Sequence, residues 1–169
     1  MTGVAVVGEG VIGTSTALAI KKTRPDINVT VFHDRPFHEI CSAMPAGLFR
    51  FDNVDDRSDA KATFNWYAEL CRQYPGSITG VKLLSGHIQS DSKEALEQQG
   101  VKVLGEWCHL RPARDSIRVE SVEKRSKRGN SYTIVHNYGH GGHGFTLGWG
   151  TALRAAALVD KALINRAKI

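Results

Sequence analysis

The sequence predicts an α/β fold built on a parallel sheet, and three features near its beginning carry this prediction. An apolar run, Val4–Val7, is typical of a buried strand and leads directly into the glycine loop Gly8–Gly13. Apolar and small side chains then recur at helical spacing until Pro25 ends the helix. The β-branched run Asn28–His33 predicts a second strand, which closes at Asp34. A strand, a helix and a strand in this order form one parallel unit.

The glycine loop has the G-x-G-x-x-G pattern of a dinucleotide site. Gly8, Gly10 and Gly13 would provide a tight turn, close backbone approach to a pyrophosphate, and close packing of the helix on the strand. Asp34 follows the last of them at the expected separation of about twenty residues and would accept a ribose hydroxyl. Glu9 departs from the pattern and is tolerable only if its side chain points away. The alternative is an α/β unit without a ligand.

The next stretch combines a loop and a helix. Within Asp34–Phe51, the small residues of Ser42–Gly47 would let the loop lie against a flat ligand. Asp59–Tyr74 predicts an amphipathic helix. We assign its aromatic stripe to the core, with members Phe64, Tyr67, Cys71 and Tyr74.

The second half of the chain predicts short strands and one long helix. In chain order these are a strand at Gly80–Ser90, a helix at Lys93–Gln99 capped by Ser92, a short apolar piece at Val101–Leu104, a turn opened by Arg111–Arg114, a hairpin of Ser116–Glu123 with Tyr132–Val135, and a helix from Thr151 onward. The basic run Lys124–Arg128 fits a solvated turn between the hairpin strands.

The run His136–Gly150 holds six glycines among its fifteen residues and separates the last strand from the last helix. A glycine turn before a helix exposes backbone N–H groups that suit anionic or electron-rich ligands. His136, His140 and His143 suggest a metal, but no Cys or acidic residue stands at metal-ligand spacing, so we expect none. On the local sequence, a glycine-rich turn without any ligand is the open alternative.

The composition and charge of the chain limit the classes of protein to which it can belong. A chain of 169 residues with 41% hydrophobic and 23% charged residues predicts one globular domain rather than a disordered protein. The net charge of +5 suits an anionic cofactor or substrate but is too weak to indicate nucleic acid. No apolar run predicts a membrane span. Three cysteines without motif spacing predict reduced thiols in an intracellular compartment.

Two separated blocks of sequence resemble one family. Val4–Gly13 with Phe32–Arg35 resembles the opening of the D-amino-acid oxidase and D-aspartate oxidase family. Leu110–Arg114, Val135–Gly144 and Trp149–Ala152 resemble its closing signature, which an NAD-dependent dehydrogenase of the plain type lacks. Two further stretches look most similar to the D-aspartate oxidase branch, Cys41–Arg50 and Leu84–Gln89.

The resemblance implies a Rossmann-like FAD-binding domain with a parallel sheet and the remnant of an α+β substrate domain. The positions that match the family's FAD contacts are Gly8, Gly10, Val11, Ile12 and Gly13 at the pyrophosphate, Asp34 and Arg35 at the ribose, Cys41, Ser42, Ala46, Gly47 and Leu48 along the flavin, and Gly141, Gly142, Gly144, Phe145 and Thr146 at the isoalloxazine ring.

The resemblance also implies a substrate site. Arg111 matches the clamp on the substrate α-carboxylate, which a planar guanidinium can hold bidentately, and the Gly142 carbonyl would face the substrate amine. Arg50 is our candidate for the side-chain carboxylate of D-aspartate, with a solvated loop arginine as the alternative. The implied reaction converts D-aspartate or similar acidic D-amino acids, with molecular oxygen, to the 2-oxo acid, ammonia and hydrogen peroxide.

Members of this family are a good deal longer than this chain. The resemblance implies two family blocks, 1–98 and 101–169, joined directly in a single domain of residues 1–169, as in a shortened isoform. Lost interior strands would expose apolar faces, a large penalty against a stability margin of about 5–15 kcal/mol. Two alternatives stay open: a non-catalytic form that binds FAD weakly or acts only as an interaction fragment, and an oxidase of broader D-amino-acid specificity. The oligomeric state stays open as well.

Two features bear on location. Ala167–Ile169 loosely matches the Ser-Lys-Leu peroxisomal signal, and members of this family are commonly peroxisomal. We expect a peroxisomal protein, and otherwise a cytoplasmic one.

Overall fold

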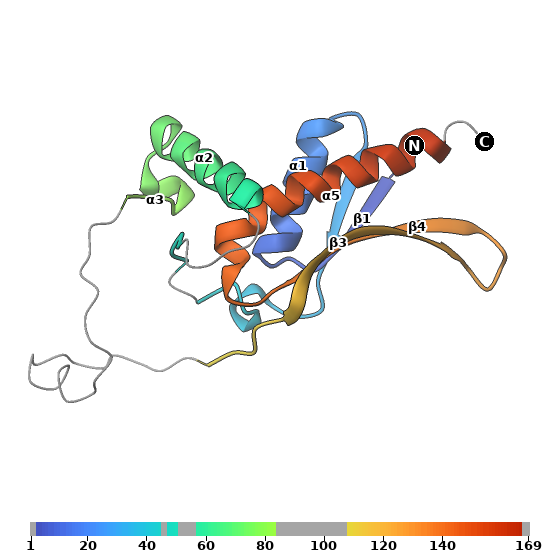
Figure 1. The fold of residues 1–169 in the computed structure, drawn as a ribbon, viewed down its shortest axis with the longest axis horizontal. Coiled ribbons are helices and arrows are strands. Elements are labelled where there is room, and N and C mark those ends of the chain that lie inside the picture. Colours follow the sequence, from blue (N-terminus) through green and yellow to red (C-terminus); the bar gives the residue numbers. More distant parts are fainter. Residues whose placement is uncertain (1–2, 45–46, 51–56, 84–107, 167–169) are drawn as a thin grey trace, which may run out of the picture.

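A computed structural model describes residues 3–44, 47–50, 57–83 and 108–166. They form a mixed α/β structure with two two-stranded sheets (Figure 1). The elements are β1 (Gly3–Val7), α1 (Val11–Thr23), β2 (Asn28–Phe32), the 3-10 turn η1 (Phe37–Glu39), α2 (Arg57–Gln73), α3 (Gly76–Thr79), β3 (Ala113–Arg125), β4 (Ser131–His140), the 3-10 turn η2 (Gly141–His143) and α5 (Gly144–Arg166).

The strand–helix–strand unit predicted from the first residues is confirmed. β1 and β2 pair in parallel, from Gly3 opposite Asn28 to Val7 opposite Phe32, and α1 makes the crossover between them. Val6 lies in the main core cluster, and Val4 packs against it from the same face of the strand. This alternation follows from the two-residue period of a strand.

The core lies between α1 and α5, which are in contact and cross each other in Figure 1. Ala19, Ile20, Ala152 and Ala156 are buried there, and small side chains at three of these positions let the helix axes approach closely. Next to this contact, the rings of Trp149 and Trp66 stack at 4.3 Å, with an angle of 13° between their planes. This stack ties α2 to the core.

α2 crosses α5 at a glycine, which changes the predicted inner face of α2. A Cβ at Gly150 would lie 2.3 Å from the backbone of Asp59, so only glycine allows this approach. The buried residues of α2 are therefore Asp59, Ala60 and Thr63. The prediction of an aromatic core stripe was wrong for its ends, because Phe64 and Tyr74 are exposed at 52% and 49%.

The hairpin and the glycine run also depart from prediction. β3 and β4 are longer than predicted, and their antiparallel register has an irregularity between Ala113 and Arg118. β4 continues to His140 and α5 begins at Gly144 rather than Thr151, so the turn shrinks to η2. The predicted strand at Gly80–Ser90 is absent from its described part, residues 80–83, and the elements expected between 84 and 107 lie outside the described residues. Among the described helices, none is long and apolar enough to cross a membrane.

Candidate functional site

A cavity of about 1040 Å³ extends along β1 to the glycine loop at the carboxyl end of that strand. Open parallel sheets bind ligands at this edge, and the volume is at the upper end of the range for ligand pockets, about 300–1,000 Å³. The cavity collects most of the predicted site residues. These are Gly8, Gly10, Val11, Ile12, Gly13, Cys41, Ser42, Gly47, Leu48, Arg50, Arg111, Gly141, Gly142, Gly144 and Phe145. The remaining predicted residues are Asp34, Arg35 and Thr146, which do not line it, and Ala46, which lies outside the described residues.

The glycine loop forms a tight joint between β1 and α1. Gly8 has a φ of 103°, which favours glycine, and its N–H donates to the carbonyl of Phe32 at 2.8 Å. A Cβ at Gly13 would lie 1.8 Å from the carbonyl oxygen of Gly8, which no side chain can tolerate. The third glycine of the motif therefore permits the helix to pack against the loop, as the sequence pattern predicts.

The N-terminus of α1 faces the cavity with backbone N–H groups that lack acceptors among the described residues. The N–H of Val11 donates to the Ser42 hydroxyl at 2.9 Å, and the N–H of Thr14 donates to the Gly10 carbonyl at 3.0 Å. Among the described hydrogen bonds, the N–H groups of Ile12 and Gly13 have no acceptor. Two unpaired donors at the positive end of a helix dipole make an anion-binding position.

Glu9, the acidic residue within the glycine loop, is directed away from the anion-binding position at the N-terminus of α1. Glu9 does not line the cavity, although Gly8 and Gly10 on either side of it do. Its carboxylate instead lies 3.7 Å from Nδ1 of His33. The Oε1 atom of Glu9 is buried and has no hydrogen-bond partner among the described residues.

Asp34 lies at the end of β2 but is not directed into the cavity. Arg35 donates to both oxygens of its carboxylate, from Nε at 3.1 Å and from Nη2 at 2.6 Å. These hydrogen bonds lower the pKa of Asp34. Its side chain is 75% exposed. The structure thus places Asp34 and Arg35 against each other and does not bring them to the cavity.

Glycines also shape the opposite wall, between the start of β3 and the end of β4. Gly139 has a φ of 93°, and a Cβ there would lie 2.7 Å from the Arg114 side chain. The Gly141 N–H donates to the Pro112 carbonyl at 3.0 Å. A Cβ at Gly142 would lie 2.8 Å from Nη1 of Arg111. The glycines let the Arg111 guanidinium lie directly over the backbone of η2.

Arg50 reaches the same cavity from the loop before α2. The Thr146 hydroxyl in the first turn of α5 donates to the Arg50 carbonyl at 3.0 Å and accepts from the Arg50 N–H at 3.4 Å. Hydrogen bonds to neighbouring elements therefore fix the backbone of Arg50 and that of Pro112, which follows Arg111. Among the described lining residues there is no aspartate or glutamate, so the cavity is electropositive.

The histidines of the glycine run have different surroundings. His136 and His140 both line the cavity, but His140 is 6% exposed and its Nε2 lies 2.9 Å from the Thr151 hydroxyl. Burial lowers the pKa of His140 to about 4, so the ring is neutral at neutral pH. In the described part of the chain, no three His, Cys, Asp or Glu residues form a group that could hold a metal.

Two supporting contacts were not foreseen from the sequence. The Tyr67 hydroxyl donates to the Phe145 carbonyl at 2.9 Å, and burial raises the pKa of Tyr67 to about 12, which keeps it protonated. The Asn137 amide donates to the Thr16 hydroxyl at 3.0 Å. Each pair joins residues more than seventy positions apart, so no local pattern could have indicated it.

Comparisons with known proteins point to one family. The chain is 31% identical to D-aspartate oxidase 1 of Caenorhabditis elegans over 331 residues, which covers 98% of this chain and 99% of the relative. It is 27% identical to D-aspartate oxidase 2 of Caenorhabditis briggsae over 325 residues, covering 95% and 98%. It is 44% identical to D-aspartate oxidase 2 of Caenorhabditis elegans over 138 residues, covering 81% and 41%. No family model matches the chain.

The alignment lengths carry a second finding. The alignment with the first of these relatives spans 331 residues, whereas this chain has 169. About half of that relative therefore has no counterpart in this chain.

Proposed function

The chain belongs to the family of D-amino-acid and D-aspartate oxidases, and from this premise we propose that it catalyses the FAD-dependent oxidative deamination of D-aspartate and similar acidic D-amino acids. The products are the 2-oxo acid, ammonia and hydrogen peroxide. One observation carries the proposal. A single electropositive cavity joins the glycine loop, the N-termini of two helices, and the residues Arg50 and Arg111.

FAD fits this cavity on features of the chain itself. The unpaired N–H groups of Ile12 and Gly13 suit a pyrophosphate, and the glycine loop leaves room for it beside a Rossmann-like strand–helix–strand unit. The Cys41–Leu48 loop and the Gly141–Phe145 backbone would hold the flavin ring from two sides, with Thr146 fixing the start of α5. Asp34 would accept a ribose hydroxyl once Arg35 releases one of its oxygens.

When bound, FAD would supply the acceptor for the hydride that leaves the substrate Cα, and molecular oxygen would be reduced to hydrogen peroxide. The chain's own task is to orient the substrate. Arg111 would hold the α-carboxylate through two parallel N–H donors, and the Gly142 carbonyl would accept a hydrogen bond from the amine. Fixing both groups directs the Cα–H bond, and such positioning contributes much of the rate in reactions of this kind.

Arg50 is the reason that we propose an acidic substrate. A dicarboxylate needs a second cation, and Arg50 lines the same cavity as Arg111. The Thr146 hydroxyl binds both the N–H and the carbonyl of Arg50, which fixes the backbone from which its side chain extends. If Arg50 does not bind the side-chain carboxylate of the substrate, the expected activity is that of an oxidase with broader D-amino-acid specificity.

The test begins with purified protein and added FAD. Flavin absorbance that stays with the protein through gel filtration and is released by denaturation supports the cofactor assignment. Peroxide formed from D-aspartate, and not from L-aspartate, supports the reaction. Bound flavin with no peroxide from any D-amino acid would refute turnover by this chain and leave cofactor binding standing.

Bound flavin without peroxide would support our second candidate function, a non-catalytic FAD-binding module. It is favoured by the alignment in which about half of the relative has no counterpart here. We place the joint between the family blocks 1–98 and 101–169, within one domain of residues 1–169. Peroxide assays on a chimera that restores the relative's intervening segment would separate the candidates. Activity in the chimera alone assigns this chain to the non-catalytic class.

We also propose a peroxisomal location. It rests on the match of Ala167–Ile169 to the Ser-Lys-Leu signal and on the peroxisomal location that is common in this family. Residues 167–169 lie outside the described part of the chain. A fluorescent protein fused to the N-terminus tests it, because that fusion leaves the last three residues free. Peroxisomal puncta that become cytoplasmic when the three residues are removed support the proposal, and diffuse signal from both fusion proteins refutes it.

A further inference from the structure

We propose that the part of the cavity between β1 and β4 binds an extended strand from another polypeptide in parallel with β1. We call this part the strand slot. Its walls are β1 and β4, and its floor is formed by apolar residues of α1 and α5, namely Ile20, Val159, Ala162 and Leu163. The slot extends along β1 as far as Val7, next to the glycine loop, and no contact with FAD enters the proposal.

The two walls belong to different sheets. β1 pairs with β2, β4 pairs with β3, and in the described structure no ladder of hydrogen bonds joins β1 to β4. Both strands nevertheless line one cavity. A gap between two strand edges above an apolar floor has the shape of a position for one more strand.

The edge of β1 presents donors to this gap. The Gly8 N–H bonds to Phe32 in β2, and the direction of N–H groups alternates along a strand. The N–H groups of Ala5 and Val7 therefore point away from β2. An unpaired strand edge is a template for another strand. An alkyl chain of equal length would fill the slot but leave these donors unsatisfied, so a peptide is the better occupant.

The surroundings of the edge also indicate an incomplete sheet. Parallel sheets are normally buried on both faces, yet Val7 and Phe32 are 86% and 53% exposed. On the β4 wall, the side-chain oxygen of Asn137 is buried and lacks a hydrogen-bond partner among the described residues. A backbone N–H from an inserted strand would give this acceptor a donor.

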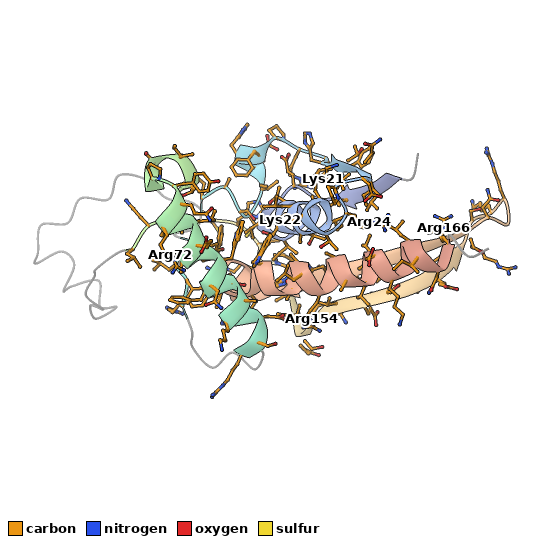
Figure 2. The ribbon with its side chains drawn as sticks, turned by 90° about the horizontal axis from the view of Figure 1, so that it is seen from above. Lys21, Lys22, Arg24, Arg72, Arg154 and Arg166 are labelled. Atoms are coloured by element: carbon orange, nitrogen blue, oxygen red, sulfur yellow. The ribbon has the colours of Figure 1, made fainter. Side chains whose placement is uncertain are left out.

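Charge complementarity defines the occupant further. No described lining residue is acidic, and Arg166, at the far end of α5 in Figure 2, lines the slot near the beginning of β1. Its guanidinium also donates to the Ser131 carbonyl at 3.1 Å. The partner segment should be β-branched and apolar along its length and carry an acidic residue at its amino end.

The probe is a synthetic peptide, acetyl-Glu-Val-Ile-Val-Val, with fluorescein on a Gly-Ser extension at its carboxyl end. Its matched control is the same peptide with every central amide N-methylated, which removes the donors and blocks pairing. We expect fluorescence anisotropy to rise with the full-length protein and the first peptide only. Amide exchange at Ala5 and Val7 should slow at least tenfold when the peptide is bound.

A variant pair tests the same edge from the protein side. Ala5→Pro removes an outward N–H at a position where an edge strand tolerates proline, whereas Ala5→Thr keeps it. We expect the proline variant to weaken binding at least tenfold and the threonine variant to bind within twofold of the parent.

Three results would overturn the proposal. One is no anisotropy change up to about 1 mM protein, the limit of weak binding. Another is equal binding of the N-methylated peptide. The last is sedimentation showing a dimer in which the Ala5 and Val7 amides are already protected, since the occupant would then be a second copy of the chain.

Discussion

The guanidinium of Arg111 lies over the backbone of Gly142, where a Cβ would stand only 2.8 Å from its Nη1. The substrate clamp and the backbone carbonyl proposed to face the substrate amine are thus neighbours in space, although 31 positions separate them in the sequence. A ligand that carries a carboxylate and an amine on one carbon can meet both. This proximity is the geometric basis for the predictions on substrate binding.

Replacing Arg111 tests the clamp. Arg111→Leu removes the charge, and Arg111→Lys keeps the charge but loses the bidentate fork. Hydrogen bonds to charged groups contribute about 1.5–3 kcal/mol, so D-aspartate binding should weaken roughly ten- to a hundredfold in the leucine variant and less in the lysine variant. Calorimetric titration with malonate, a dicarboxylate that has no amine and is not oxidised, measures carboxylate binding independently of turnover. Unchanged affinity in the leucine variant, with flavin still bound, would refute the assignment.

Arg50 should matter for acidic substrates more than for neutral ones. Arg50→Ala removes the proposed second cation, so kcat/KM should fall about tenfold or more for D-aspartate and little for D-alanine. Thr146→Val should reproduce part of this loss, because the Thr146 hydroxyl holds the backbone of Arg50. Peroxide assays with both substrates provide the comparison. Equal effects on the two substrates would remove Arg50 from the specificity argument.

Gly13 should be irreplaceable for packing. In Gly13→Ala the new Cβ would lie 1.8 Å from the Gly8 carbonyl oxygen, so the loop or helix must shift, and overpacking of this kind costs about 1–3 kcal/mol. Gly3→Ala is the matched control, since its Cβ would be 3.7 Å from the nearest atom. We expect a lower melting temperature and loss of flavin in Gly13→Ala only. Similar melting curves for both variants would contradict the role of this contact.

Local signals explain why the first part of the fold was predictable. The β1–α1–β2 unit is encoded within consecutive residues, through strand period, helix spacing and the glycine loop. Gly148 and Gly150 were interpreted as part of a turn because glycine is a poor helix former. In the structure they lie in α5, since a Cβ would meet Ile12 at 3.3 Å and the Asp59 backbone at 2.3 Å. These partners are distant in sequence and leave no local trace.

In the candidate site, too, some features follow from local sequence signals and others do not. The cavity gathers the glycine loop and the Gly141–Phe145 segment as predicted, because both begin helices that pack on each other. Asp34 was placed by its distance from the loop, which is a local signal. That signal could not reveal that Arg35 would bind both of its oxygens, at 3.1 and 2.6 Å. Competition between adjacent side chains is decided by their conformation, not by their spacing.

His140 should make stability depend on pH. Burial lowers its pKa from the ordinary 6.5 to about 4, so between these values the unfolded chain binds more protons than the folded one. The free energy of unfolding therefore falls as the pH drops through this window, by about 3 kcal/mol at pH 4 relative to neutral pH. His140→Gln cannot titrate and should lack this part of the dependence. Urea unfolding from pH 7 to 4 measures the difference. Parallel profiles for the two proteins would contradict the prediction.

The ion pair between Asp59 and Arg154 should be the largest single electrostatic contribution to folding among those described. Arg154 donates from Nη1 to the Asp59 carboxylate at 2.7 Å, and Asp59 is only 3% exposed. In Arg154→Leu this carboxylate would stay buried without its cation, and breaking a buried pair costs about 3–5 kcal/mol. Because Arg154 itself is half-exposed, water can screen the charge, and we expect a cost near the lower end of that range.

Arg72→Leu is the control for this last prediction. Arg72 pairs with Glu69 at 3.6 Å on the exposed side of α2, and Figure 2 shows Arg72 and Arg154 on different helices. Exposed pairs contribute at most about 1 kcal/mol, so this variant should unfold close to the parent. Urea unfolding of both variants gives the comparison. If the two variants lose similar stability, Asp59 must keep adequate solvation or another donor after Arg154 is removed, and the buried pair would not anchor α2 to α5.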